Sequence, residues 1–192
     1  MKFDKSLLIS FILLIVIASL YRVMPGRPMG FAPHIAMALF GGAVISDKKM
    51  SFILPLLSLL ISDIIYEVLY INKLSVMPGF YSGQWVNYLW FALLTVIGFA
   101  VKKENAVSIA AGSVIGATAF FILSNFGDWL GGGLDINNVA YPKTWAGLER
   151  CYAEAIPFYQ NSLFATLFFS TVLFGGYYLA NKYWVKKTVA VA

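Results

Sequence analysis

The feature that most constrains this chain is a series of six long apolar segments with few charges inside them. They cover approximately Ser6–Tyr21, Phe31–Ser46, Met50–Ile71, Trp85–Val101, Ala106–Phe126 and Pro157–Ala180. An α-helix needs about 17 to 25 apolar residues to cross a lipid bilayer. Because 60% of the residues are hydrophobic and only 12% are charged, a water-soluble exterior could not be built. We predict one all-α integral membrane domain, residues 1–192, with six transmembrane helices and the lipid bilayer as its surroundings.

The first apolar segment has a second interpretation. The opening MKFDK, followed by an apolar run, resembles a secretory signal peptide. The region around Ile17, Ala18 and Ser19 lacks a clean small-x-small cleavage site, and this favours an uncleaved helix.

The basic residues indicate how the helices are oriented. If six helices alternate in direction, one side of the membrane receives nine lysines: Lys2, Lys5, Lys48, Lys49, Lys102, Lys103, Lys182, Lys186 and Lys187. The other side receives Arg22, Arg27, Lys73, Lys143 and Arg150. Because cytoplasmic loops carry the excess of Lys and Arg, both termini are predicted to be cytoplasmic. The net charge of +5 follows from this pattern, so we expect no nucleic-acid partner.

A separate helix is predicted on the outer face, just before the last span. Apolar residues recur there at helical spacing: Trp145, Leu148, Tyr152, Ala155, Ile156 and Tyr159. Thr144 is a suitable N-cap, and Pro157 can begin the last membrane helix because proline is tolerated in a first turn. We therefore expect an amphipathic helix that lies at the interface or folds back over the mouth of the bundle.

Two carboxylates, Asp63 and Glu67, lie within the third apolar segment. They are four residues apart, so they share one helical face. A charge at the centre of a bilayer costs about 2.5–3.5 kcal/mol, and Asp63 lies about two turns inside the outer boundary. Polar residues of other segments occur at a similar depth: Arg22, Arg27, His34, Asn87, Ser124, Asn125, Asp128, Gln160 and Asn161. Such convergence favours a polar cavity that opens outward. A structural role remains open, in which Asp63 pairs with Arg22 or Arg27 and the other groups bind across helices.

Several kinds of chemistry have no motif in the sequence. No Walker lysine loop, H-E-x-x-H pair or G-x-S-x-G elbow is present, and the chain has one histidine and one cysteine, Cys151. We therefore expect no enzyme activity, no metal site and no cofactor. Small residues, including Gly112 and Gly116 and the run Gly41-Gly42-Ala43, favour close helix packing within the chain or against a partner subunit.

The segments FAPHIAMALFGGA (31–43), ISD (61–63), SNFGDW (124–129) and YPKTWAGLERCYAEAIPF (141–158) resemble an uncharacterised bacterial membrane family. That family is grouped with the substrate-binding S components of energy-coupling factor (ECF) vitamin transporters. The resemblance implies a lid at Arg22–Phe31, above a ligand site at the outer face of the inner (cytoplasmic) membrane. Its implied wall residues are Arg22, Arg27, His34, Asp63, Glu67, Asn125, Asp128 and Trp129.

The same resemblance implies partners. S components associate with a membrane coupling subunit and two cytoplasmic ATPases, and they tip over in the membrane to deliver their ligand. Many carry an A-x-x-x-A contact motif on the first helix, whereas the corresponding segment here has only Ala18. The small-residue patch Ala36–Ala43 is a candidate substitute for that contact.

Three functions remain to be compared. The leading hypothesis is a membrane subunit that binds a small, vitamin-like molecule for uptake. The second is a structural or assembly subunit of a membrane complex. The third is a membrane enzyme or a proton-coupled carrier that uses Asp63 and Glu67.

Overall fold

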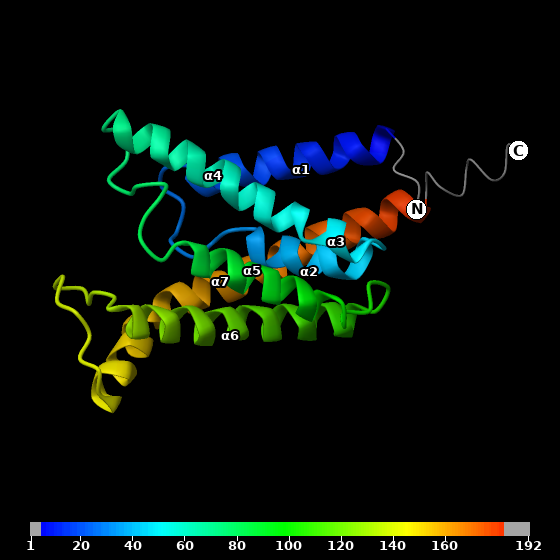
Figure 1. Cartoon of the computed structure of the whole chain (residues 1–192). Helices are drawn as coiled ribbons and strands as arrows, with labels where there is room; N and C mark the ends of the chain where they lie inside the picture. The colour runs from blue at the N-terminus through cyan, green and yellow to red at the C-terminus, as the bar shows by residue number, and fades with distance from the viewer. Residues whose placement is uncertain (1–4, 183–192) are drawn as a thin grey trace, which may run out of the picture.

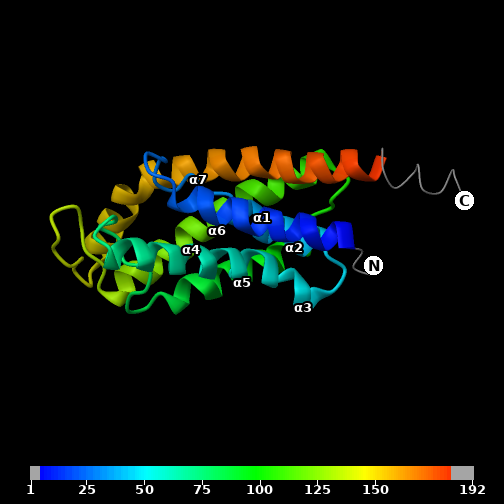
Figure 2. The same ribbon diagram turned by 90° about the horizontal axis from the view of Figure 1, so that it is seen from above.

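The protein is a bundle of helices without a strand in the part that the structure describes. The computed structural model describes residues 5–182, with side chains from Ile12 onward. Its helices are α1 (Lys5–Val23), α2 (His34–Val44), α3 (Lys48–Ser51), α4 (Ile53–Ile71), α5 (Trp85–Gly98), α6 (Ala106–Gly131) and α7 (Trp145–Ala180). The long helices run side by side along one axis in both ribbon views (Figures 1 and 2). The all-helical prediction is therefore confirmed for these residues.

The two ends of the bundle differ in what they carry. The segments 24–33, 72–84 and 132–144 gather at one end, which we call the loop end (Figure 1). The start of α1, the end of α7 and the short turns before α3 and α6 lie at the other, the terminal end. Lys2, Lys186 and Lys187, on which the orientation prediction partly depends, lie outside the described residues.

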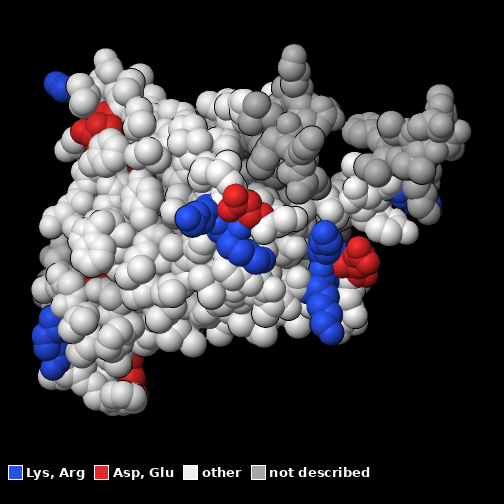
Figure 3. Space-filling view, turned by 45° about the vertical axis from the view of Figure 1, so that its right-hand side comes forward, with Lys and Arg blue, Asp and Glu red and all other residues white. Residues whose placement is uncertain are grey.

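Three helical stretches are long and apolar enough to cross a membrane. They are Lys48–Ile71, which joins α3 and α4, together with α6 and α7. Helix α2, with 11 residues, is about 17 Å long, and α5, with 14 residues, is about 21 Å long. Both are shorter than the hydrocarbon core of about 30 Å. Uncharged side chains predominate on the face drawn in Figure 3, as a lipid environment requires.

Helix α2 is the centre of the bundle. Ten of its residues are buried, from His34 to Gly42 and again at Val44, and it packs against α4, α5, α6 and α7. A helix that is apolar on all sides has no face for solvent, so the other helices surround it. Because Ala36, Ala38, Gly41 and Gly42 are all buried here, the candidate docking patch Ala36–Ala43 is not available to a partner.

Glycines let α2 and α5 approach each other closely. A Cβ at Gly42 would collide with the carbonyl oxygen of Thr95 and lie 2.9 Å from Gly98 Cα. A Cβ at Gly98 would lie 2.5 Å from the carbonyl oxygen of Leu39. In both cases the atoms that the Cβ would meet belong to the backbone and not to a flexible side chain. Any side chain here would therefore push the two helices apart.

The predicted break before the last span is wrong. Helix α7 continues from Trp145 through Pro157 to Ala180 and changes direction after its first turns (Figure 1). An internal proline removes one hydrogen bond and bends a helix without having to end it. Thr144 is the N-cap, as expected, and its hydroxyl accepts from the N–H of Gly147 at 3.2 Å.

The buried stripe in the first turns of α7 agrees with the predicted one only in part, at Ala155 and at the half-buried Leu148 and Tyr152. Trp145 is 74% exposed, and the buried positions are the small residues Gly147, Cys151 and Ala155. A Cβ at Gly147 would collide with the carbonyl oxygen of Pro142, so the loop before the helix lies directly on this face.

The segment 132–144 is tied to α7 by charged and polar contacts. Arg150 Nη2 lies 2.7 Å from an Asp135 oxygen, and Tyr141 donates to Glu154 at 2.7 Å. The N–H of Val139 donates to the Asp135 carboxylate at 2.9 Å. This hydrogen bond is the main cause of a lowered pKa of Asp135, and it keeps the carboxylate charged.

We predict that Gly42→Ala destabilises the protein by about 1–3 kcal/mol, because the added methyl group must displace α5 backbone. Gly176→Ala is the matched control, since nothing lies within 4 Å of a Cβ there. The control is expected to be neutral or slightly stabilising, because alanine is the better helix former. Thermal unfolding of the purified variants in one detergent measures both effects. Equal unfolding temperatures for the two variants would contradict the close approach of α2 and α5.

Candidate functional site

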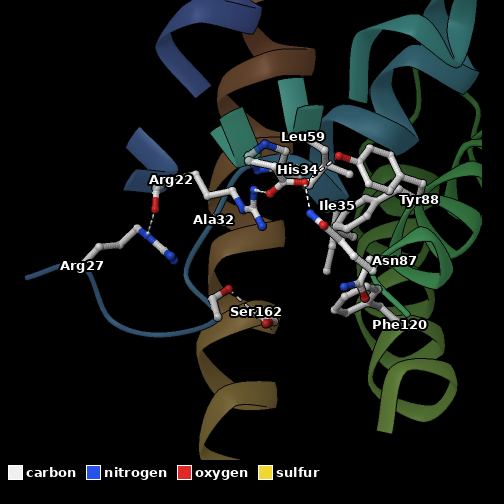
Figure 4. A pocket seen from close by; sticks show the side chains of 14 residues that line it. Arg22, Arg27, Ala32, His34, Ile35, Leu59, Asn87, Tyr88, Phe120 and Ser162 are labelled. Carbon is white, nitrogen blue, oxygen red and sulfur yellow. Dashed lines mark hydrogen bonds and ion pairs between the residues drawn. The ribbon is translucent and has the colours of Figure 1, made fainter. Parts of the chain in front are cut away.

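A polar cavity lies at the N-terminal end of α2, near the loop end of the bundle. Its volume is about 200 Å³, and helices α1, α2, α4, α5, α6 and α7 all contribute to its wall. Figure 4 shows the side chains that point toward this space. The lining residues are Arg22, Arg27, Gly30, Ala32, His34, Ile35, Leu59, Asp63, Gln84, Asn87, Tyr88, Phe91, Phe120 and Ser162. The space equals that of about six or seven water molecules, so a ligand here must be small.

The cavity exists because α2 begins deep in the bundle. Pro33 stands at the N-cap position of α2, and the irregular segment before it contains Pro28 and Gly30. Gly30 has φ +82°, and a Cβ on it would lie 2.6 Å from the carbonyl oxygen of Phe158. Only glycine therefore lets the segment 24–33 lie directly on α7. Ser162 donates to the Gly30 carbonyl oxygen at 3.0 Å and holds this segment as one wall of the cavity.

Asp63 is a buried carboxylate in the wall, and both of its oxygens have donors. It is 3% exposed, and Arg22 Nη1 binds its Oδ1 as an ion pair. Its Oδ2 accepts from Gln84 Nε2 and from the hydroxyl of Tyr88, both at 2.6 Å. A buried carboxylate is tolerated when each oxygen has a donor, which is the case here. Asp63 thus connects α1, α4 and α5, and the pairing with Arg22 considered for it is present beside an open space.

Arg27 brings a second guanidinium to the cavity. It donates to three carbonyl oxygens of its own segment, those of Arg22, Pro28 and Phe31. No carboxylate among the described residues forms an ion pair with it. Figure 4 shows Arg27 beside Arg22, to which a dashed line connects it. The positive charge of Arg27 is therefore balanced by carbonyl dipoles only.

His34 is the first residue of α2 and is 2% exposed. Its Nε2 lies 3.1 Å from the hydroxyl of Ser58, which in turn contacts Ser19 of α1 at 3.2 Å. Its Nδ1 has no hydrogen-bond partner in the described part of the chain. A proton on Nδ1 would be a buried donor without an acceptor, so a neutral ring with the proton on Nε2 fits this geometry.

The rest of the wall is apolar and aromatic. The rings of Phe91 and Phe120 lie 5.1 Å apart, and His34 meets Phe91 edge-on at 6.1 Å. Ile35 and Leu59 complete this side. The cavity therefore offers charged donors from α1 and the segment after it, and a flat apolar surface from α5 and α6.

The eight residues predicted for the ligand site separate into two groups. Four line this cavity: Arg22, Arg27, His34 and Asp63. Glu67 does not, because its carboxylate accepts from the backbone N–H groups of Gly79 and Phe80, at 2.9 and 3.1 Å. It thereby fixes the segment 72–84 onto α4. Asn125, Asp128 and Trp129 also lie elsewhere.

A second, wider cavity of about 750 Å³ holds Asn125 and Asp128. Trp129 lies outside both cavities and donates its indole N–H to Pro142 at 2.9 Å. Asn87 lines both cavities, and its side chain donates to the hydroxyl of Tyr81 at 2.6 Å. Burial raises the pKa of Tyr81, and the negative charge of Asp63 raises it further, so this hydroxyl keeps its proton.

Sequence reasoning did not include Gln84, Tyr88 and Ser162 among the site residues. Gln84 immediately precedes α5 and Tyr88 lies in its first turn, so the two residues are four positions apart. Their i, i+4 spacing is the signal that could have placed them on one face toward Asp63. Ser162 carried no such signal. The described residues contain no group of three or more His, Cys, Asp or Glu that could hold a metal ion.

We predict that Asp63→Ala lowers the free energy of unfolding by about 3 kcal/mol. The loss arises because Arg22 then lies in the protein without its counter-charge. The double variant Arg22→Met/Asp63→Leu is expected to unfold closer to the wild type, since it removes both charges. Glu67→Ala, which removes a carboxylate from the same helix outside this cavity, serves as the control and costs less. Thermal denaturation of the four proteins tests this, and a double variant no better than Asp63→Ala contradicts it.

Of three comparisons with known proteins, one identifies a family and two find no match. A search of the curated proteins and a search of the solved structures found no match. One family model matches residues 2–188, nearly the whole sequence, including every residue of both cavities. The chain belongs to the family described as "Family of unknown function (DUF6580)".

Proposed function

We propose that this protein is a membrane subunit that binds a small polar molecule at the loop end and serves its uptake into the cell. The observation that carries the proposal is the cavity at the start of α2, which combines two guanidinium groups, a carboxylate and an aromatic wall. The contacts of Asp63 hold helices together, but stability alone does not require an open space beside these charged groups. Convergent polar groups beside an apolar wall are typical of a ligand site.

The proposed topology places the loop end outside the cell. It has six spans in the inner (cytoplasmic) membrane of a bacterium and both termini in the cytoplasm. Supporting it, the short turns at the terminal end carry Lys48, Lys49, Lys102 and Lys103, and short basic turns are typical of the cytoplasmic side. The short helix α2 can belong to such a domain because it is buried along almost its whole length by the other helices.

A binding subunit is favoured over a complete carrier by what lies beneath the cavity. Along α2, the residues beyond His34 pack into apolar clusters with α1, α4, α5 and α7. Met37, Phe40 and Val44 close the centre of the bundle toward the terminal end. A ligand bound above them therefore meets apolar packing directly beneath it. Delivery would then require a change in the whole subunit, as in the ECF S components that the sequence resembles, with a coupling subunit and ATPases as partners.

The alternative of a proton-coupled carrier is less well supported by the two carboxylates. Asp63 is engaged by Arg22, Gln84 and Tyr88, and Glu67 by two backbone N–H groups. The two groups therefore bind different partners and do not form one relay. The alternative of an assembly subunit draws on Gly175 and Gly176 of α7, because nothing lies within 4 Å of a Cβ at either position. A partner helix could approach closely there.

Filling the cavity tests the proposal. We predict that Ala32→Phe, which places a ring in the cavity, reduces by at least about tenfold the amount of small molecule that the purified protein retains. Ala111→Phe is the control, because Ala111 is an exposed residue of α6 that lines neither cavity. The measurement is mass spectrometry of the compounds released when each protein, purified in mild detergent, is denatured. A wild type that retains no compound above the Ala32→Phe level contradicts the proposal.

A further inference from the structure

The positive groups around the cavity at the start of α2 outnumber its negative ones. Arg22 and Arg27 each carry a positive charge, and Asp63 is the only carboxylate in the lining. With His34 neutral, as its unpartnered Nδ1 favours, one positive charge is left without a counter-charge. An uncompensated charge in a site of low dielectric attracts a ligand of opposite charge strongly.

The hydrogen-bonding groups of the cavity also favour an anion, because more donors than acceptors are free. Both oxygens of Asp63 are occupied, so the carboxylate offers a ligand little. Arg22 donates its side-chain hydrogen bonds through Nη1 alone, and Arg27 donates its own through Nε and Nη1. Within the described chain, Nη2 of each arginine therefore remains without a partner. A molecule that enters the cavity meets free donors and few free acceptors.

The start of α2 adds a third positive feature. No side chain of the described residues caps this helix, and Pro33 precedes it. Its first turn lines the cavity through His34 and Ile35. The first N–H groups of a helix are unsatisfied and carry a partial positive charge, which favours an anion. The buried, unpartnered Nδ1 of His34 lies at the same place and shows that a polar group is unsatisfied there, although as an acceptor it would bind a donor of the ligand and not its carboxylate.

We infer that the ligand of this cavity is a small monoanionic carboxylate with an apolar body. Its carboxylate lies between Arg27 and the start of α2, and its apolar body lies against Phe91 and Phe120. A single negative charge balances the one surplus positive charge. A cavity of about 200 Å³ limits the body to about the size of one ring. This inference rests on the proposed function and specifies its substrate class.

Benzoate and benzamide are matched probes for this inference, because they have the same shape and differ in charge. We predict that benzoate binds the purified wild-type protein in lipid nanodiscs at least about tenfold more tightly than benzamide. Isothermal titration calorimetry measures both affinities. Benzamide binding as tightly as benzoate would overturn the inference while leaving a ligand-binding cavity in place. Absence of benzoate binding would overturn it as well.

Two variants show where the selectivity comes from. Arg27→Gln is expected to reduce the preference for benzoate to threefold or less, and Arg27→Lys to retain part of it. Lys73→Gln removes the same charge from a segment at the loop end but outside the cavity, and it is expected to leave the preference unchanged. An equal loss in Arg27→Gln and Lys73→Gln would point to general surface charge and contradict the inference. The wild-type comparison decides the matter even if Arg27→Gln fails to fold.

The retention experiment with Ala32→Phe separates this inference from the proposed function. If the wild type retains a compound that Ala32→Phe loses, but benzoate has no advantage over benzamide, the cavity binds a ligand of another class. If neither protein retains a compound, the proposed function fails irrespective of the benzoate result.

Discussion

The cost of burying the charge of Asp63 determines how the loop end of the molecule is built. A carboxylate in a membrane domain is stable only when donors surround it. Arg22 comes from α1, Gln84 from the segment before α5, and Tyr88 from α5 itself, so one residue of α4 brings together three other parts of the chain. Gln84 also donates to the carbonyl oxygen of Gly79, which fixes the segment between α4 and α5. The polar residues that line the cavity thus also connect the helices and the segment 72–84 at the loop end.

The central helix supplies the other constraint. Because α2 has only 11 residues and starts at His34, the bundle above it is not filled by helix backbone. Arginine side chains, an aromatic wall and the segment 24–33 enclose the remaining space. Below His34 the same helix is surrounded by apolar side chains. The shortness of one helix therefore accounts both for the cavity and for its closure toward the terminal end.

The sequence predicted those features that follow from a large free-energy cost, such as exposing an apolar segment to water or burying a charge. Hydrophobic segments predicted the helical bundle. The burial cost of Asp63 predicted a polar neighbourhood and left Arg22 and Arg27 as its candidate partners, of which the structure shows Arg22. The continuation of α7 through Pro157 could not be read from the sequence, because a proline can begin a helix as well as bend one. The role of Glu67 also depended on the path of the segment 72–84, which places Gly79 and Phe80 against its carboxylate. Depth along a helix alone does not say on which side of it a loop will lie, so Asn125 and Asp128 could not be assigned to their own cavity.

Asn87 belongs to the walls of both cavities, and this arrangement has a consequence for selection. The second cavity, of about 750 Å³, is several times larger than the one at the start of α2, of about 200 Å³. The side chain of Asn87 is held between them by its hydrogen bond to Tyr81. A substitution of Asn87 therefore changes both spaces at once, so neither cavity can adapt at this position without affecting the other.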